Sequence, residues 1–354
     1  MGGDHRRRRP GDTLLRLKPD VFKLLVERYG VRGFALEGDY GGCERVNRYI
    51  HGGEGTAREA AAAIGFAIYR TEEMAELIMY MRRYNEGAAE GDDLRFYGFD
   101  MQRYRYSVRY LIEACATLSV DTGDMERLMD GDGWSDAYDV PARMATIDRV
   151  KAELTGGEAS AEALHLADML VRYCELQDPS NADGALRDRL MAENVLWIAE
   201  RELEAGRDRV FVSGHNGHVA RWGSYDSMGK LLAKAVGDGY YAIGTDFYRT
   251  RCNLPRSSSG RRTKQVFYSH DPLAKAANEA GLDTCWLDFS RVAESPELAE
   301  LTSRYLYMGN LGERYAWIMR LLPPSYRMFQ PPATLYDGMI YVAEATPTDI
   351  LGEE

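Results

Sequence analysis

The stretch that decides the fold is RVFVSGHNGHVARW, residues 209–222. The β-branched and aromatic residues at 210–212 predict a short buried strand. This strand runs into small residues and then into His-Asn-Gly-His at 215–218, which holds two of the six histidines of the 354-residue chain. Ligands of open α/β sheets gather beyond the carboxyl ends of the strands, and histidine titrates near neutrality. The stretch therefore predicts a strand with a functional site at its end.

Strand-like and helix-like segments alternate on both sides of this stretch. Apolar residues at helical spacing, with typical start and stop signals, predict helices at 19–30 and 71–87. Short strands are predicted at 31–42 (running into a glycine-rich loop), 94–100, 209–213, 239–248, 265–269, 283–289 and 338–345. This alternation indicates an α/β fold with a largely parallel central sheet flanked by helices.

The segment from about residue 103 to 205 reads as helical throughout, with its longest helix at 182–206, and so predicts a helical insertion or cap beside the sheet. The expected organisation has four parts. They are an atypical, disordered N-terminus at 1–16, the first part of the α/β core at 17–102, the helical insertion at 103–206, and the second part of the core at 207–354. PRSSSGRR at 255–262 is expected to be a mobile loop.

Composition narrows the class of protein. A hydrophobic content of 45% allows a sizeable core, and no run approaches the roughly 18–20 apolar residues of a membrane span. The N-terminus has no apolar region typical of a secretory signal. The five cysteines are far apart and never in a Cys-x-x-Cys pair, which favours reduced thiols in the cytoplasm. A net charge of −11 argues against a nucleic-acid partner, so a small molecule is the expected one.

Three chemically notable groups fall at predicted strand ends: Glu37 after FAL, Asp100 after FYGF, and the histidines His215 and His218. A carboxylate near an imidazole is what general acid–base chemistry requires. For Asp100 an N-cap of the next helix is the favoured interpretation. For Glu37, a functional role and a structural role are equally supported, because the glycines that follow it allow a close backbone approach that a helix cap does not need.

The histidine pair has three interpretations: metal ligands, acid–base residues, or a structural cap. As metal ligands, His215 and His218 need further ligands that no spacing in the chain singles out. There is no Gly-x-Ser-x-Gly elbow, no phosphate-binding loop and no Gly-x-Gly-x-x-Gly after a strand, so no nucleotide or other cofactor is expected. His51 and His165 are interpreted as structural, and His270 as a helix-start residue.

Several segments together resemble the erythromycin esterase family, which also includes proteins labelled as succinoglycan biosynthesis proteins. They occur in the family's order, and the similarity covers the chain from about Leu17 onward. The segments are FALEGDYGGCERVNRYIHG, FYGFD, RDRLMAENVLWI, GHNGHVARW and YYAIGTDFY.

The resemblance implies hydrolysis of an ester, in the better-studied members a macrolide lactone, by a water activated on histidine without a covalent serine intermediate, a metal or a cofactor. It carries catalytic roles to Glu37, Arg187, His215 and His218. Glu37 would orient an imidazole or the water, and Arg187 with a histidine would hold the developing oxyanion, an effect of about 3 kcal/mol per donor. The substrate-binding residues implied are Asn47, Asp100, Glu193 and Asn216.

One part of the family pattern is missing. The family's Gly-Glu-x-x-His-Gly segment, whose histidine is the principal general base, should place that histidine near Arg9 and its glutamate near Arg6. The sequence there reads GGDHRRRRPGDTLL, with His5 in the wrong context. We hypothesise a misassigned, frame-slipped or decayed start, and loss of a general base typically costs about 10²–10⁴ in rate.

Two alternatives remain open at this stage. The first is a metal-dependent hydrolase that uses His215 and His218, which a chelator would inactivate. The second is a non-catalytic small-molecule binding protein on the same scaffold, which a ligand would stabilise without turnover.

Overall fold

The computed structural model describes residues 13–129, 140–181, 183–269, 271–347 and 349–352. The predicted atypical N-terminus at 1–16 lies outside the described residues as far as residue 12, and His270 lies outside them as well. The chain forms two compact units. We call Leu24–Arg70 with Met74–Gly214 the parallel-sheet unit, and the described residues up to Lys23, Thr71–Glu73 and those from His215 onward the mixed-sheet unit.

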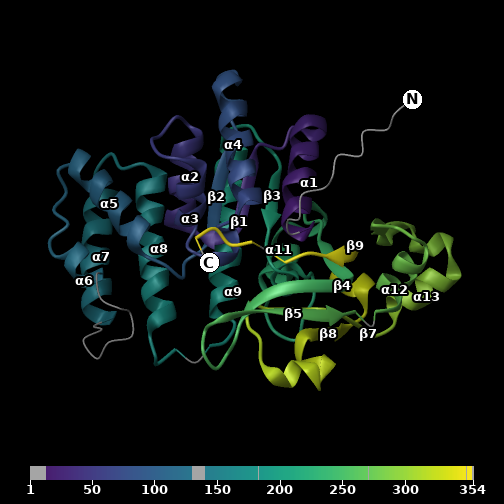
Figure 1. The fold of residues 1–354 in the computed structure, drawn as a ribbon. Helices are drawn as coiled ribbons and strands as arrows, with labels where there is room; N and C mark the ends of the chain where they lie inside the picture. The colour runs from purple at the N-terminus through teal and green to yellow at the C-terminus, as the bar shows by residue number, and fades with distance from the viewer. Residues whose placement is uncertain (1–12, 130–139, 182, 270, 348, 353–354) are drawn as a thin grey trace. The chain divides into compact units, whose positions relative to one another are not determined.

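The parallel-sheet unit is built on three strands, β1 (Gly33–Asp39), β2 (Arg95–Asp100) and β3 (Val210–Ser213). Their order is β2-β1-β3, and both pairs are parallel (Figure 1). The helices of this unit are α2 (Tyr40–Ile50), α3 (Ala57–Ala63), η1 (Ala67–Tyr69), α5 (Arg105–Thr117), α6 (Met125–Met129), α7 (Val140–Thr155), α8 (Ala161–Gln177) and α9 (Leu186–Glu204). Helices α1 (Thr13–Tyr29) and α4 (Glu72–Gly87) contribute residues to both units.

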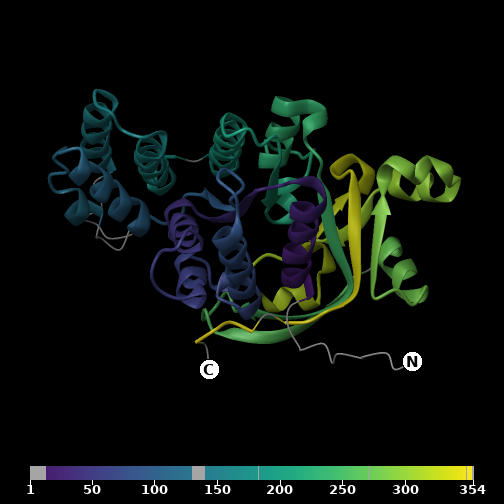
Figure 2. The same ribbon diagram turned by 90° about the horizontal axis from the view of Figure 1, so that it is seen from above.

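Helices cover both faces of the parallel sheet, as seen from above in Figure 2. Side chains alternate along a strand, so Gly33 and Glu37 of β1 share one face and Gly38 belongs to the other. Helix α9 lies on the first face, because a Cβ at Gly33 would come within 3.1 Å of the Glu202 carboxylate. Helix α2 lies on the second face, where a Cβ at Gly38 would come within 2.9 Å of the Cys43 sulfur.

The glycines after β1 do not form the predicted loop; they lie in the first turn of α2. The helix starts at once because the Asp39 carboxylate caps it, accepting a hydrogen bond from the Gly42 amide at 2.9 Å. A Cβ at Gly41 would lie 2.4 Å from the Ser107 amide nitrogen, and one at Gly42 would lie 2.0 Å from the Ala63 carbonyl oxygen. The close backbone approach that these glycines allow is therefore to the protein's own α5 and α3.

The mixed-sheet unit holds a four-stranded sheet of order β5-β4-β9-β6 and a separate ribbon of β7 and β8. Strands β4 and β9 are parallel, and the other neighbours are antiparallel. The strands are β4 (Ile243–Pro255), β5 (Arg262–Tyr268), β6 (Thr284–Asp288), β7 (Leu306–Gly309), β8 (Arg327–Gln330) and β9 (Gly338–Ala345). The helices are α10 (Asn216–Val219), α11 (Met228–Val236), η2 (Gly237–Gly239), α12 (Pro272–Glu279), η3 (Phe289–Glu294), α13 (Pro296–Ser303), η4 (Trp317–Arg320), η5 (Pro323–Tyr326) and α14 (Pro332–Leu335).

The segment 255–262, expected to be a mobile loop, is the connection of a β-hairpin. Its end residues Pro255 and Arg262 pair at the end of the ladder of β4 and β5, and residues 256–261 form the turn. The hairpin covers a core cluster that includes Phe247, Leu254 and Phe267. Burying these side chains favours the extended pairing despite the serine- and glycine-rich turn.

The predicted fold class is confirmed, since helices and strands alternate around a parallel sheet in one unit and a sheet with a parallel centre in the other. Between β2 and β3 the described residues contain helices α5 to α9 and no strand. Over the part of the chain that the structure describes, no helix is long and apolar enough to cross a membrane.

Candidate functional site

In the parallel-sheet unit, Arg187 bridges two carboxylates at the carboxyl ends of neighbouring strands. Its Nη2 donates to Glu37 Oε1 at 3.0 Å and to Asp100 Oδ2 at 2.6 Å, and its Nε donates to Asp100 Oδ1 at 3.2 Å. Glu37 comes from β1, Asp100 ends β2, and Arg187 lies in the first turn of α9. Three of the five predicted catalytic and substrate-binding residues of this unit thus form one cluster, which we call the Arg187 cluster.

The Asp100 carboxylate is fully buried and makes several hydrogen bonds. It accepts from the Met101 amide and from Gln102 Nε2, both at 2.8 Å, in addition to Arg187. The N-cap interpretation of Asp100 is wrong, because α5 begins only at Arg105 and the residue before that helix is Tyr104. Asp100 instead compensates the charge of Arg187.

The two carboxylates keep Arg187 protonated. Burial alone would lower the pKa of Arg187, but the Asp100 and Glu37 carboxylates outweigh that effect and raise the pKa above its ordinary value. The side chain of Glu37 is 15% exposed and that of Arg187 is 26% exposed, whereas Asp100 has no exposed side-chain surface. Glu37 and Arg187 are therefore the members that a small molecule can reach.

Asp39 is a buried carboxyl beside this cluster that the sequence analysis did not single out. It is 2% exposed and accepts hydrogen bonds from the amides of Gly42 at 2.9 Å and Arg103 at 3.1 Å. Burial and, to a smaller extent, the Asp100 charge raise the pKa of Asp39 to about 8, although the two amide donors act to lower it. Asp39 could have been identified as an aspartate directly before a helix. Because the glycines that follow were interpreted as a loop, no helix was expected there.

In the mixed-sheet unit, His215 directly precedes the short helix α10, and His218 lies within that helix. His215 is its N-cap residue: the Gly217 amide donates to Nδ1 at 3.4 Å, while Nε2 lies 3.1 Å from the Leu311 carbonyl oxygen. The two imidazole rings are 6.2 Å apart between centroids and inclined at 65°. The structural-cap interpretation is thus correct for one nitrogen of His215, and it leaves an acid–base role for the ring open.

Asn216 has structural partners in β4. Its Oδ1 accepts from the Thr245 amide at 3.1 Å, and its Nδ2 donates to the Thr245 carbonyl oxygen at 2.6 Å. The predicted substrate-binding side chain therefore ties the His-Asn-Gly-His segment to the central strand of the mixed sheet.

Asn47 and Glu193 lie away from the Arg187 cluster. Asn47 Oδ1 accepts from the Phe96 amide, four residues before Asp100 and therefore about 13 Å up the strand. It lines a cavity of about 40 Å³ between α2, β2 and α9, which is large enough for water but too small for an ester. Glu193 is six residues after Arg187 on α9, is exposed, and pairs with Arg172 at 3.0 Å. Both remain predictions as substrate contacts.

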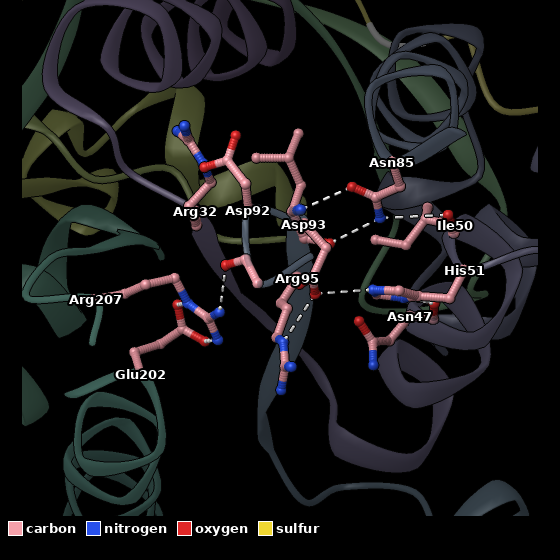
Figure 3. Close-up of polar contacts among 12 residues, drawn as sticks. Arg32, Asn47, Ile50, His51, Asn85, Asp92, Asp93, Arg95, Glu202 and Arg207 are labelled. Carbon is pink, nitrogen blue, oxygen red and sulfur yellow. Dashed lines mark hydrogen bonds and ion pairs between the residues drawn. The ribbon is translucent and has the colours of Figure 1, made fainter. Parts of the chain in front are cut away.

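Figure 3 shows a second polar network, at the amino end of β2. His51 Nε2 lies 3.1 Å from Asp93 Oδ2, and His51 Nδ1 lies 2.7 Å from the carbonyl oxygen of Asn47. Both ring nitrogens face oxygen acceptors, and the backbone of His51 caps the carboxyl end of α2, so this pair is structural. His165 is also structural: it is 3% exposed and stacks on Trp197 with centroids 3.7 Å apart.

Among the residues with described positions, no group of three or more His, Cys, Asp or Glu side chains is arranged to hold a metal ion. The chemistry that the two clusters offer is acid–base and electrostatic: a carboxylate fixed by a guanidinium in one unit, and two imidazoles in the other.

Comparisons with known proteins give one family by sequence and several solved structures with a shared fold. The sequence model of the erythromycin esterase family matches residues 26–345. A protein from Bacillus cereus aligns with a TM-score of 0.80 and 18% identity, over 96% of this chain and 87% of that chain. A succinoglycan biosynthesis protein aligns with a TM-score of 0.75 and 18% identity, over 96% and 86% of the two chains.

A variant of an erythromycin esterase in its open conformation aligns with a TM-score of 0.62 and 14% identity, over 94% of this chain and 88% of that chain. At these identities the structural alignments show a shared fold. No curated protein sequence matches the chain significantly.

Proposed function

The chain belongs to the erythromycin esterase family, and from this premise we propose that it hydrolyses a carboxylic ester, with macrolide lactones among the candidates, using a water molecule activated on histidine. The observation that carries the proposal is the Arg187 bridge between Glu37 and Asp100 at the carboxyl ends of two parallel strands. Ligand sites of α/β folds form at this edge.

In this proposal, His215 or His218 takes a proton from the attacking water, and the resulting hydroxide oxygen bonds to the ester carbonyl carbon. Glu37 orients the imidazole or the water. The bridging contacts favour a role for Arg187 in holding Glu37 in place, since its charge is already compensated by two carboxylates, over a direct role at the oxyanion.

The family resemblance assigns catalytic roles to Glu37 and to both histidines, so we propose that they act on the same ester.

The absence of the family motif should lower the rate of ester hydrolysis. By the family resemblance the glutamate and histidine should lie near Arg6 and Arg9, so we propose that the sequence as given hydrolyses its ester about 10²–10⁴ times more slowly than a version that carries the motif. We also propose a cytoplasmic location, which the five thiol cysteines support.

The test is an ester panel, macrolides included, on the chain as given and on a version in which residues 5–10 read Gly-Glu-x-x-His-Gly. The second version is expected to hydrolyse at least one ester, and adding His215→Ala or Glu37→Gln should abolish the gain. His51→Ala is the matched control, because it removes a structural histidine and should leave turnover unchanged.

Other results identify the alternatives. Background rates on every ester with the motif in place would contradict the proposal, and a ligand-dependent rise in melting temperature would then indicate a binding protein. Loss of activity in chelator would instead indicate a metal-dependent hydrolase at His215 and His218.

A further inference from the structure

Helices α2, α5 and α8 of the parallel-sheet unit line a groove, which we call the Tyr40 groove. Helix α5 packs on both α2 and α8 (Figure 1). The groove has a volume of about 300 Å³, which is within the range of small-molecule sites. It adjoins the cavity of about 40 Å³ described above, because Tyr40, Glu44 and Glu162 line both. No residue of the Arg187 cluster lines it, so the groove is separate from the proposed ester site.

The walls of the Tyr40 groove carry more negative than positive charge. Three carboxylates line it, Glu44, Glu113 and Glu162, against one guanidinium, that of Arg48, which gives a net charge of −2. Arg48 Nε donates to Glu44 Oε1 at 3.0 Å, and its Nη1 donates to Glu113 Oε2 at 2.7 Å. The guanidinium also lies 3.7 Å from the centroid of the Tyr110 ring. Because Arg48 is already paired with two carboxylates, the excess negative charge attracts a cation from outside.

Two polar groups of the groove have no hydrogen-bond partner. Glu162, in the first turn of α8, makes no hydrogen bond or ion pair with the residues that the structure describes. Tyr40 is 6% exposed, and its hydroxyl has no hydrogen-bond partner among the same residues. Burial raises the pKa of Tyr40, and the nearby charges of Glu44 and Glu162 raise it further, so the hydroxyl lies close to both carboxylates. Buried polar groups are nearly always hydrogen-bonded, so this hydroxyl points to a polar ligand.

The rest of the lining indicates what kind of cation fits. Ala163 and Leu166 of α8 are both 5% exposed and give the groove an apolar surface on which an alkyl chain can pack. Over the described part of the chain, no three His, Cys, Asp or Glu side chains are arranged to hold a metal ion. The carboxylates of the groove are therefore set too far apart for one metal ion, whereas a longer cation with two charges can reach more than one of them.

We propose that the Tyr40 groove binds a small aliphatic diamine. One ammonium group lies beside Glu162 and donates a hydrogen bond to the Tyr40 hydroxyl. The other lies beside Glu44 and Glu113, whose two charges Arg48 only half compensates, and the alkyl chain covers Leu166. This ligand is distinct from the ester of the proposed function, and the inference does not depend on that function.

The test is isothermal titration calorimetry of the whole chain with diaminobutane at pH 7. We expect saturable binding with a Kd of about 1 mM or tighter. Butylamine, which carries one charge, should bind about 10-fold more weakly, and butanediol, which carries none, should not bind. Raising the ionic strength to about 1 M should weaken the binding of diaminobutane, because the Debye length falls to about 3 Å.

Variants locate the site. Glu162→Gln should weaken the binding of diaminobutane about 10-fold or more. Tyr40→Phe, which keeps the ring that packs on His165 and Trp197, should weaken it about 3- to 10-fold. Glu158→Gln is the matched control: it removes the same charge from the turn before α8, outside the lining of the groove, and should leave the Kd nearly unchanged. If Tyr40→Phe does not fold, as its melting temperature would show, the two glutamate variants carry the test.

Three results would overturn the inference: butanediol binding as tightly as diaminobutane, no detectable binding of diaminobutane well above the expected Kd, or equal effects of Glu162→Gln and Glu158→Gln. Displacement of diaminobutane by an equal concentration of magnesium chloride would also overturn it, because it would indicate a metal-ion site. None of these measurements requires ester turnover. Failure of the proposed function would therefore leave the diamine site standing, and absence of diamine binding would leave the proposed function standing.

Discussion

The guanidinium of Arg187 compensates the charges of two carboxylates. One of these, Asp100, has no exposed side-chain surface. A buried ion pair contributes little relative to an apolar replacement of both partners. Removing a single partner is different, since the other charge is then left buried and uncompensated. The consequence for this chain is that Asp100 depends on Arg187 for its stability as well as for its position.

We expect Arg187→Met to lower the free energy of unfolding by about 3–5 kcal/mol, and Arg187→Met with Asp100→Asn to recover part of that loss. The measurement is urea unfolding at pH 7. The matched control is Arg172→Met on the neighbouring helix α8, which pairs with the exposed Glu193 and should cost about 1 kcal/mol or less. Equal costs for the two single changes would contradict the assignment of Asp100 as a carboxylate that needs Arg187.

The sequence could suggest Glu37 and Asp100 as candidate site residues, because a carboxylate at the end of a predicted strand is a local pattern. It could not join them to Arg187 except through the family resemblance, since Arg187 is 150 residues from Glu37 along the chain. Asp39 was not predicted because its role depends on where α2 begins. Gly41 and Gly42 indicated a loop at that place instead of a helix.

Among the elements, helix α2 is one in which close packing requires a residue with poor helix propensity. Glycine normally weakens a helix by about 0.5–1 kcal/mol relative to alanine. In α2, however, a Cβ at Gly42 would lie 2.0 Å from the Ala63 carbonyl oxygen, so the helix approaches α3 more closely than any other residue permits. The strand-helix-helix arrangement that carries Glu37 depends on this approach.

Gly42→Ala is accordingly expected to destabilise the protein by about 1–3 kcal/mol or more, as overpacking does, despite its better helix propensity. Gly87→Ala, at the last residue of α4, is the matched control: nothing lies within 4 Å of its added Cβ, so it should be neutral or slightly stabilising. Thermal and urea unfolding of the two variants measure the difference. If Gly42→Ala is as stable as Gly87→Ala, the close contact with α3 is not required.

The elements that the sequence predicted best are those whose pattern is local and long enough to repeat. Strand β2 and helix α4 appear close to the expected limits. Strands β7 and β8 were not expected, because LYMG and RMFQ are four residues each and cannot show a period. The hairpin of β4 and β5 was missed because its turn residues favoured a loop, and because the residues on which its apolar side chains pack, such as Tyr315 and Tyr326, lie far away in the sequence.

At the scale of the whole molecule, three buried carboxyls give an unusual dependence on pH. Burial raises the pKa of Asp39 to about 8, of Asp271 to about 7 and of Asp246 to about 6, against 3.8 for an ordinary aspartate. Between pH 3.8 and each of these values, the folded chain keeps a proton that the unfolded chain has released. Raising the pH therefore favours unfolding. His165 opposes this trend below pH 6.5, because burial lowers its pKa to about 4.

With three protons set against one, the free energy of unfolding should fall from pH 5 to pH 8, by up to about 1.4 kcal/mol per pH unit for each net proton, and the melting temperature should fall with it. Above pH 7, Asp39 holds most of the excess protons that remain on the folded chain. Asp39→Asn should therefore make the melting temperature less dependent on pH between 7 and 8, whereas Asp271→Asn should act mainly below that interval. Melting temperatures of the three proteins at half-unit steps from pH 5 to 8 measure both effects. A melting temperature that rises toward pH 8 would show that these carboxyls are ionised in the folded chain, held so by amide donors such as those of Gly42 and Arg103 at Asp39.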